Sequence, residues 1–149
     1  MTNYLVNRLR RAAGTMTTAL LLTQAMARAD VVLDWNAIMQ STVSGQAPFP
    51  QSRFAAITQL AVFEAVNAIR KDYQPYLETI AASADASAEA AAVAAAHAVL
   101  KNYFPASVAA LDAARMISLA AIPDGSAKTA GIGVGERAAA AVIAARNND

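Results

Sequence analysis

Three polar side chains lie on or beside the apolar stripe of a predicted helix and are the first candidates for chemistry. Arg53, Glu64 and Asn67 fall within residues 50–70, where apolar residues recur at three- and four-residue steps. Eleven residues close about three turns of a helix, so Arg53 and Glu64 lie on the apolar side. Polar groups there are costly to bury unless each finds a partner. Arg53 and Glu64 are about 16 Å apart along the axis, so each needs a partner on another element. We interpret the three as a structural polar cluster, with an active site as the alternative.

His97 is the only histidine of the chain. It could serve as a general base or a ligand, but no second histidine lies at metal-binding spacing. A two-histidine metal site and a histidine phosphotransfer pair are excluded by count. We therefore interpret His97 as structural.

The segment Gly131-Ile-Gly-Val-Gly135 resembles a phosphate-binding loop only superficially. The nucleotide-binding fingerprints need a preceding strand, and the P-loop also needs a Gly-Lys-Ser/Thr ending; neither is present. The alternative is a stripe of small residues that allows close contact between helices. Its members are Gly131, Gly135, Ala138, Ala139 and Val142.

The remaining chemistry-bearing residues form no recognisable catalytic pattern. No Gly-x-Ser-x-Gly motif surrounds a serine, no cysteine is present, and the basic residues are too dispersed for binding nucleic acid. The carboxylates show no spacing that would pair two of them for acid–base work. These carboxylates are Asp30, Asp34, Glu64, Asp72, Glu89 and Asp112. The sequence predicts no catalytic residue and no metal ligand.

Residues 1–29 have the features of a signal peptide. They hold four arginines and no acidic residue, although the 149-residue chain has a net charge of only +1. The apolar stretch 12–25 is too short to span a membrane, and Ala27-Arg28-Ala29 fits a signal-peptidase site. We expect cleavage after Ala29, leaving a mature domain of residues 30–149 in the periplasm or outside the cell, with no membrane span. An amphipathic N-terminal helix is the alternative.

The mature chain is predicted to be all-α, a bundle of about five helices. No segment alternates with period two, whereas helical periodicity recurs throughout. Pro50 is expected to open the second helix after an extended turn at 47–50, and residues 77–86 are expected to form a loop. The expected helices are 30–44, 50–70, 87–104, 105–121 and 126–146.

Several side chains have expected places in this bundle. Val32, Trp35, Met39 and Val43 share one helix face, and the indole N–H of Trp35 needs one acceptor. The alanine-rich segment 87–104 is read as a packed helix rather than low-complexity disorder, because alanine is the best helix former. Tyr73 and Tyr76 are expected to fold back on residues 50–70.

Taken in order, several short sequence segments resemble the N-terminal helical region of bacterial vanadium-dependent haloperoxidase-like proteins. These proteins belong to the type 2 phosphatidic acid phosphatase superfamily. The segments span nearly all of residues 31–146. Family members usually carry Asp where this chain has Glu64, which keeps the carboxylate. The segments are Val32-Leu-Asp-Trp-Asn36, Arg53-Phe-Ala-Ala-Ile57, Ala61-Val-Phe-Glu-Ala-Val-Asn-Ala-Ile69, Tyr73-Gln-Pro-Tyr76, Ser87-Ala-Glu-Ala-Ala-Ala92, Ala95-Ala-His-Ala-Val-Leu100, Phe104-Pro105, Ile122-Pro-Asp-Gly125 and Gly131-Ile-Gly-Val-Gly135.

The resemblance implies an all-helical protein whose relatives bind vanadate or phosphate. Their oxyanion cage uses Lys-x6-Arg-Pro, Pro-Ser-Gly-His and Ser-Arg-x5-His, where cations neutralise the oxyanion and histidines act on it. None of these motifs occurs in this chain. No catalytic residue is therefore transferred from the family, and no cofactor is expected in this chain.

The expected function is that of an exported N-terminal helical portion of a haloperoxidase-like or acid-phosphatase-like protein, incomplete and inactive alone. Its expected partner is a second copy, by self-association, or a catalytic half. The alternative is a self-sufficient secreted helical module that binds a partner such as a separate catalytic half. A complete enzyme of unknown chemistry built on Arg53, Glu64 and Asn67 is the third hypothesis.

Overall fold

The computed structural model describes residues 30–77 and 79–147, and this part of the chain contains helices and no strand. The prediction of an all-α bundle of five helices is confirmed. The segment predicted to be a signal peptide, residues 1–29, lies outside the described residues. The helices are α2 (Val31–Val43), α3 (Pro48–Arg70), α4 (Ala88–Tyr103), α5 (Val108–Ala120) and α6 (Ser126–Ala145), with a short 3-10 turn η1 (Pro105–Ser107) before α5.

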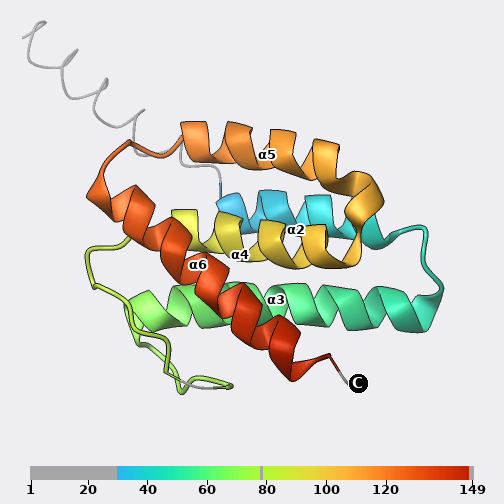
Figure 1. The fold of residues 1–149 in the computed structure, drawn as a ribbon, viewed down its shortest axis with the longest axis horizontal. Helices are drawn as coiled ribbons and strands as arrows, with labels where there is room; N and C mark the ends of the chain where they lie inside the picture. The colour runs from blue at the N-terminus through green and yellow to red at the C-terminus, as the bar shows by residue number, and fades with distance from the viewer. Residues whose placement is uncertain (1–29, 78, 148–149) are drawn as a thin grey trace, which may run out of the picture. The chain divides into compact units, whose positions relative to one another are not determined.

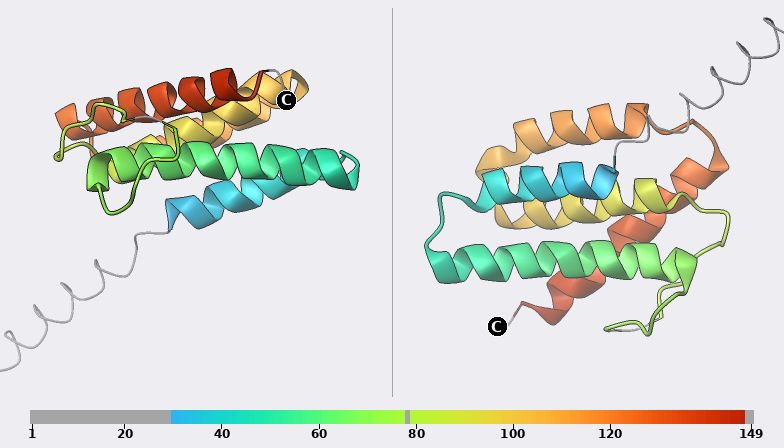
Figure 2. Two further views of the ribbon diagram at one scale, coloured as in Figure 1. Left: turned by 90° about the horizontal axis from the view of Figure 1, so that it is seen from below. Right: turned by 180° about the vertical axis from the view of Figure 1, so that it is seen from behind.

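Helix α4 is the centre of the bundle and contacts each of the four other helices. Helices α5, α4 and α3 lie side by side, α6 crosses one face of α3 and α4, and α2 lies on the other face (Figures 1 and 2). Residues 90–97 of α4 are all buried. A helix that is apolar all round is stable only when it is covered all round, which this arrangement achieves. The alternative of low-complexity disorder for this segment is wrong.

Small residues allow α6 to approach α4 very closely. A Cβ atom built on Gly131 would lie 2.2 Å from the backbone oxygen of Ser87, and one on Gly135 would lie 2.2 Å from that of Ala91. Ala138, Ala139 and Val142 of the predicted stripe are buried along with these glycines. The interpretation of the glycine segment as a helix-packing stripe is confirmed.

Three details differ from the sequence prediction. Helix α3 begins at Pro48 rather than Pro50, because both prolines fall in the first turn, where a missing N–H leaves no bond unmade. Residues 105–107 form η1, so α5 begins at Val108. Val32 is 36 % exposed, while Trp35, Met39 and Val43 are buried as expected.

Candidate functional site

Arg53 binds the end of another helix. Its Nη2 donates a hydrogen bond to the backbone oxygen of Arg146, 3.2 Å away, just after the last turn of α6. Backbone oxygens at a helix C-terminus have no partner within the helix and carry a partial negative charge. The guanidinium therefore caps α6 and ties it to the first half of α3.

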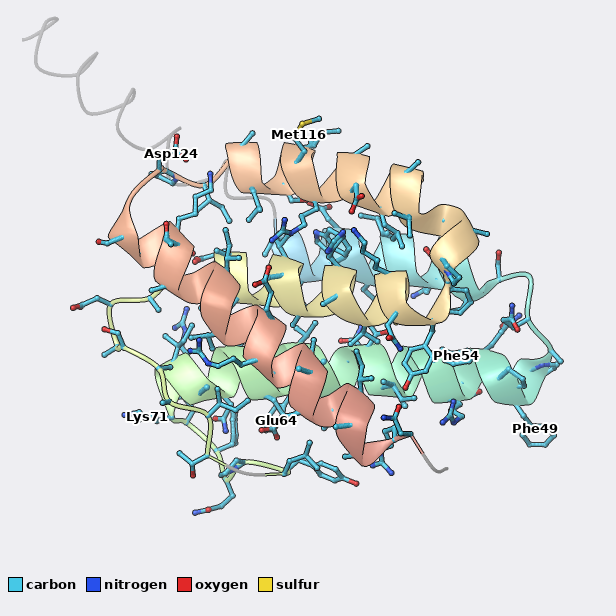
Figure 3. The ribbon with its side chains drawn as sticks, viewed as in Figure 1. Phe49, Phe54, Glu64, Lys71, Met116 and Asp124 are labelled. Carbon is cyan, nitrogen blue, oxygen red and sulfur yellow. The ribbon has the colours of Figure 1, made fainter. Side chains whose placement is uncertain are left out.

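Glu64 and Asn67 fasten the loop after α3 to the helix. The Glu64 side chain is buried, and its Oε1 accepts a hydrogen bond from the Tyr76 backbone N–H at 2.5 Å. Asn67 donates to the Tyr73 backbone oxygen and accepts from the Tyr73 N–H, both at 2.9 Å. Glu64 points from α3 toward this loop (Figure 3). The two tyrosines thus fold back on α3, as predicted.

Arg53, Glu64 and Asn67 do not converge on a shared ligand. Arg53 binds α6, whereas Glu64 and Asn67 bind backbone groups of the loop that follows α3. Buried polar groups with backbone partners hold elements in place at little net cost. Their geometry is that of attachments between elements.

A second polar cluster, which the sequence analysis did not find, joins α4 to α5. His97 Nε2 lies 2.7 Å from Asp112 Oδ1, and Lys101 Nζ lies 3.1 Å from the same oxygen. The cluster borders an open hollow of about 750 Å³. The hollow is lined by His97, Lys101, Asp112, Arg115, Met116, Leu119, Ala120, Asp124 and Lys128.

One signal in the sequence could have revealed this pair. His97 and Asp112 lie at nearly equal distances before and after the break at Phe104-Pro105. Two helices joined by a short connection run antiparallel, so residues equally far from the connection face each other. The spacing of the two residues about this break is therefore the sequence feature that predicts the contact.

The direction in which each pKa of this pair is shifted indicates the protonation state of His97 and of Asp112 at neutral pH. Burial lowers the pKa of His97 below 6.5, a shift that the hydrogen bond to Asp112 opposes only in part. The hydrogen bonds from His97 and Lys101 hold the pKa of Asp112 below 3.8. At neutral pH a neutral imidazole therefore donates its Nε2 proton to an ionised carboxylate.

The other charged groups around the hollow are paired within the protein. Arg115 Nη2 lies 2.9 Å from Glu136 Oε1, and Lys128 Nζ lies 2.8 Å from Asp124 Oδ1. The His97 side chain is only 9 % exposed. Its ring meets that of Trp35 edge-on, with centroids 6.2 Å apart. This arrangement links four helices, and it leaves the imidazole little access to a substrate.

We expect the free energy of unfolding to fall on acidification in two stages. The folded-state pKa of His97 lies below 6.5, so the unfolded chain binds this proton more readily and stability is lost as the pH drops below 6.5. The pKa of Asp112 is also lowered, so its contribution is lost below 3.8, as the pH falls through the folded-state value. Urea unfolding from about pH 8 to about pH 3 measures both stages.

His97→Gln is the matched control for this prediction. Because the chain has one histidine, the variant should lose the first stage. The second stage should persist in smaller form, because Lys101 still hydrogen-bonds Asp112. If His97→Gln lost stability just below pH 6.5 as the unchanged chain does, the assignment of the first stage to His97 would be wrong.

Helix α5 presents an apolar surface to solvent. The outer face of α5 is defined by its exposed apolar residues, Ala109, Ala110, Ala113, Met116, Ile117 and Ala120. Met116 and Ile117 are 68 % and 70 % exposed, and Met116 points away from the other helices (Figure 3). Leu111 is the only fully buried residue of this helix.

The polar side chains of α5 contact its neighbours instead. Asp112 binds α4, Arg115 binds Glu136 of α6, and Ser118 Oγ accepts a hydrogen bond from Trp35 Nε1 of α2 at 3.1 Å. This last bond supplies the acceptor predicted for the indole. A surface helix normally turns its charged residues to water and its apolar stripe to the core. Helix α5 instead carries apolar residues on its outer face as well as against the core, where Leu111, Ala114 and Leu119 pack.

Neither a metal-binding cluster nor a membrane-spanning helix is found among the described residues. Residues 30–77 and 79–147 contain no group of three or more His, Cys, Asp or Glu side chains placed to hold a metal ion. No helix in that part of the chain is both long enough and apolar enough to cross a membrane.

Comparisons with protein-family models, with curated proteins and with solved structures find no match to this chain.

Proposed function

We propose that the chain is an exported helical scaffold, akin to the N-terminal helical region of vanadium-dependent haloperoxidase-like proteins, without catalytic groups of its own. In this proposal the outer face of α5 docks on a catalytic part that carries the oxyanion cage for vanadate or phosphate. That part lies in the same polypeptide or in a separate one.

The observation that carries this proposal is the apolar outer face of α5, which lies opposite the side that packs on the core. Asp112 is the one charged residue among the exposed residues of α5; it binds α4, and the partly buried Arg115 binds α6. Contiguous exposed apolar surface of this kind marks an interaction site. A catalytic part packed on α5 would turn this edge helix into an inner one.

The polar contacts elsewhere support a structural role. Arg53, Glu64 and Asn67 bind backbone groups, and His97 joins α4 to α5. Each is engaged within the bundle, so each contributes to the scaffold.

Export is part of the proposal and has structural support in the position of α2. This helix begins at Val31, so cleavage after Ala29 would leave all five described helices intact. The mass of the secreted chain tests this: an N-terminus at Asp30 is expected, and a retained Met1 would contradict export with processing.

A self-sufficient secreted module is the second candidate, favoured by the closed core around α4. Buried residues from all five helices form one hydrophobic cluster. Cooperative unfolding of the isolated chain, with coincident transitions by two probes, favours this candidate. Unfolding without a cooperative transition favours a scaffold that depends on its catalytic part.

We expect the purified chain to show neither vanadate-dependent bromination nor phosphate release from a generic phosphate ester. The physical reason is that both reactions need cations and histidines converging on one oxyanion, whereas Lys101, Arg115 and Lys128 already bind carboxylates. Rates are measured against buffer and against His97→Ala. Turnover by the chain that His97→Ala abolishes would overturn the proposal.

A further inference from the structure

A pocket of about 350 Å³ lies between the last turns of α3 and the loop that follows this helix. We call it the loop pocket. Glu64 and Asn67 of α3 line it, and most of its wall is apolar. A mostly apolar pocket of this size, with a few polar groups to fix orientation, is typical of a site for a small molecule. The apolar wall includes Ala68, Pro75, Ile80 and Ala82.

Glu64 has hydrogen-bonding capacity that the protein does not use. It is 2 % exposed, and its Oε1 accepts the hydrogen bond from the Tyr76 N–H. Among the described residues, no donor reaches its second oxygen, Oε2. Oε2 is not sealed in the interior either, because the buried side-chain atoms without a partner in that part of the chain are Tyr103 Oη and Arg115 Nε. We therefore take Oε2 to open on the loop pocket. Asn67, by contrast, has both ends of its amide bound to the loop backbone.

The negative charge of Glu64 has no counterpart among the described residues. None of the ion pairs that they form includes Glu64. A carboxylate withdrawn from water is costly unless a cation or several donors compensate it. Attaching the loop does not need this charge, because the amide oxygen of a glutamine would accept the same N–H. A buried carboxylate whose charge the fold does not use indicates a positively charged ligand.

The end of α3 adds to the attraction for a cation. The pocket lies beside the last turn of α3, which ends at Arg70. The last carbonyl groups of a helix lack partners within the helix and carry a partial negative charge. Lys71 is the one cation among the described lining residues, and it lies roughly 10 Å beyond Glu64 along the axis (Figure 3). It is exposed, so solvent screens its charge.

We infer that the loop pocket binds a small organic cation, a primary ammonium group that carries an apolar body. The ammonium donates to Glu64 Oε2, and the apolar body packs against Ala68, Ile80 and Ala82. An ammonium places three donors on one compact charge, which suits a single carboxylate. A metal ion fits less well, because the described residues offer no group of three His, Cys, Asp or Glu side chains to hold it. The pocket lies at the loop after α3, so its ligand is independent of the outer face of α5 and of the resemblance to haloperoxidase-like proteins.

Calorimetric titration of the full chain with benzylammonium tests the site. We expect saturable binding, because the ring fills the apolar part of the pocket and the ammonium pairs with Glu64. Benzyl alcohol has the same ring without the charge, so it should bind about tenfold more weakly or worse. Equal affinities for the two probes would overturn the assignment of a cation site, and the absence of saturable benzylammonium binding at millimolar concentration would overturn the pocket as a site.

Glu64→Gln removes the charge and keeps an acceptor for the Tyr76 N–H. It should weaken benzylammonium binding by about tenfold or more and leave benzyl alcohol binding unchanged. Lys71→Gln is the matched control: it removes a charge of the opposite sign beside the same pocket, so it should bind benzylammonium at least as tightly as the unchanged chain. Circular dichroism checks that both variants fold. A folded Glu64→Gln variant with undiminished benzylammonium affinity would show that Glu64 is not the partner.

Nuclear magnetic resonance locates the ligand without any substitution. In the unchanged chain, the benzyl ring should give nuclear Overhauser contacts to the methyl groups of Ile80 and Ala82, which line the loop pocket. These contacts decide the question even if Glu64→Gln fails to fold. Benzylammonium that binds without them occupies another place, and that result would overturn the inference.

Discussion

Gly135→Ala is expected to destabilise the fold by about 2–3 kcal/mol, the cost of forcing atoms into a close-packed contact. The added Cβ would lie 2.2 Å from the backbone oxygen of Ala91 and 2.8 Å from the Cβ of Ala94. The backbone oxygen cannot rotate away as a flexible side chain would, so α6 must move off α4. Alanine's better helix propensity, worth about 1 kcal/mol, offsets only part of this cost. Urea unfolding monitored by circular dichroism measures the difference.

Gly133→Ala provides the matched control two residues away. The nearest atom to its added Cβ is Arg137 Nη1 at 3.4 Å, the end of a flexible side chain. This variant should therefore gain roughly 0.5–1 kcal/mol from reduced backbone entropy in the unfolded chain. Equal effects of the two substitutions would contradict the close contact between α4 and α6.

Trp35→Ala is expected to cost about 3–5 kcal/mol, the range for truncating a large buried aromatic side chain. Trp35 is 2 % exposed, packs in the core and donates to Ser118 of α5. Its removal opens a cavity beside His97 and loses the link from α2 to α5. Circular dichroism is again the suitable probe, since the chain has no other tryptophan.

Trp35→Phe and Ser118→Ala separate packing from hydrogen bonding. Ser118→Ala removes the acceptor alone and should cost about 1 kcal/mol. Trp35→Phe keeps most of the ring and should fall between Ser118→Ala and Trp35→Ala. A Trp35→Phe variant as unstable as Trp35→Ala would show that the hydrogen bond, rather than packing, carries the contribution.

Much of the helical architecture could be predicted from local pattern and chain breaks. Pro105 and Pro123 interrupt the helical periodicity, and Ser87 caps α4 by accepting a hydrogen bond from the Ala90 N–H at 3.1 Å. The alanine content of residues 88–103 predicted a helix, but only the arrangement of the other helices shows that this helix is central.

The polar contacts were harder to predict because they depend on tertiary neighbours. Arg53, Glu64 and Asn67 could be recognised as needing partners, yet their partners are backbone groups, which any sequence supplies. Asp112 has no feature in the sequence that marks it as a partner, and the turn at Pro105 brings its side chain beside His97. The outward direction of Met116 and Ile117 follows from which side of α5 meets α4, and periodicity alone does not specify that side.

The two close-contact glycines of α6 also determine how far that helix can slide along α4. A shift by one helical turn would bring Ala127 or Ala139 to a position that a glycine now occupies. Either alanine would place a methyl group against a backbone oxygen of α4, as Gly131 and Gly135 avoid doing. The paired glycines therefore oppose a shift by one turn in either direction, and they help to hold α6 in its register along α4 together with the buried Val134 and Val142.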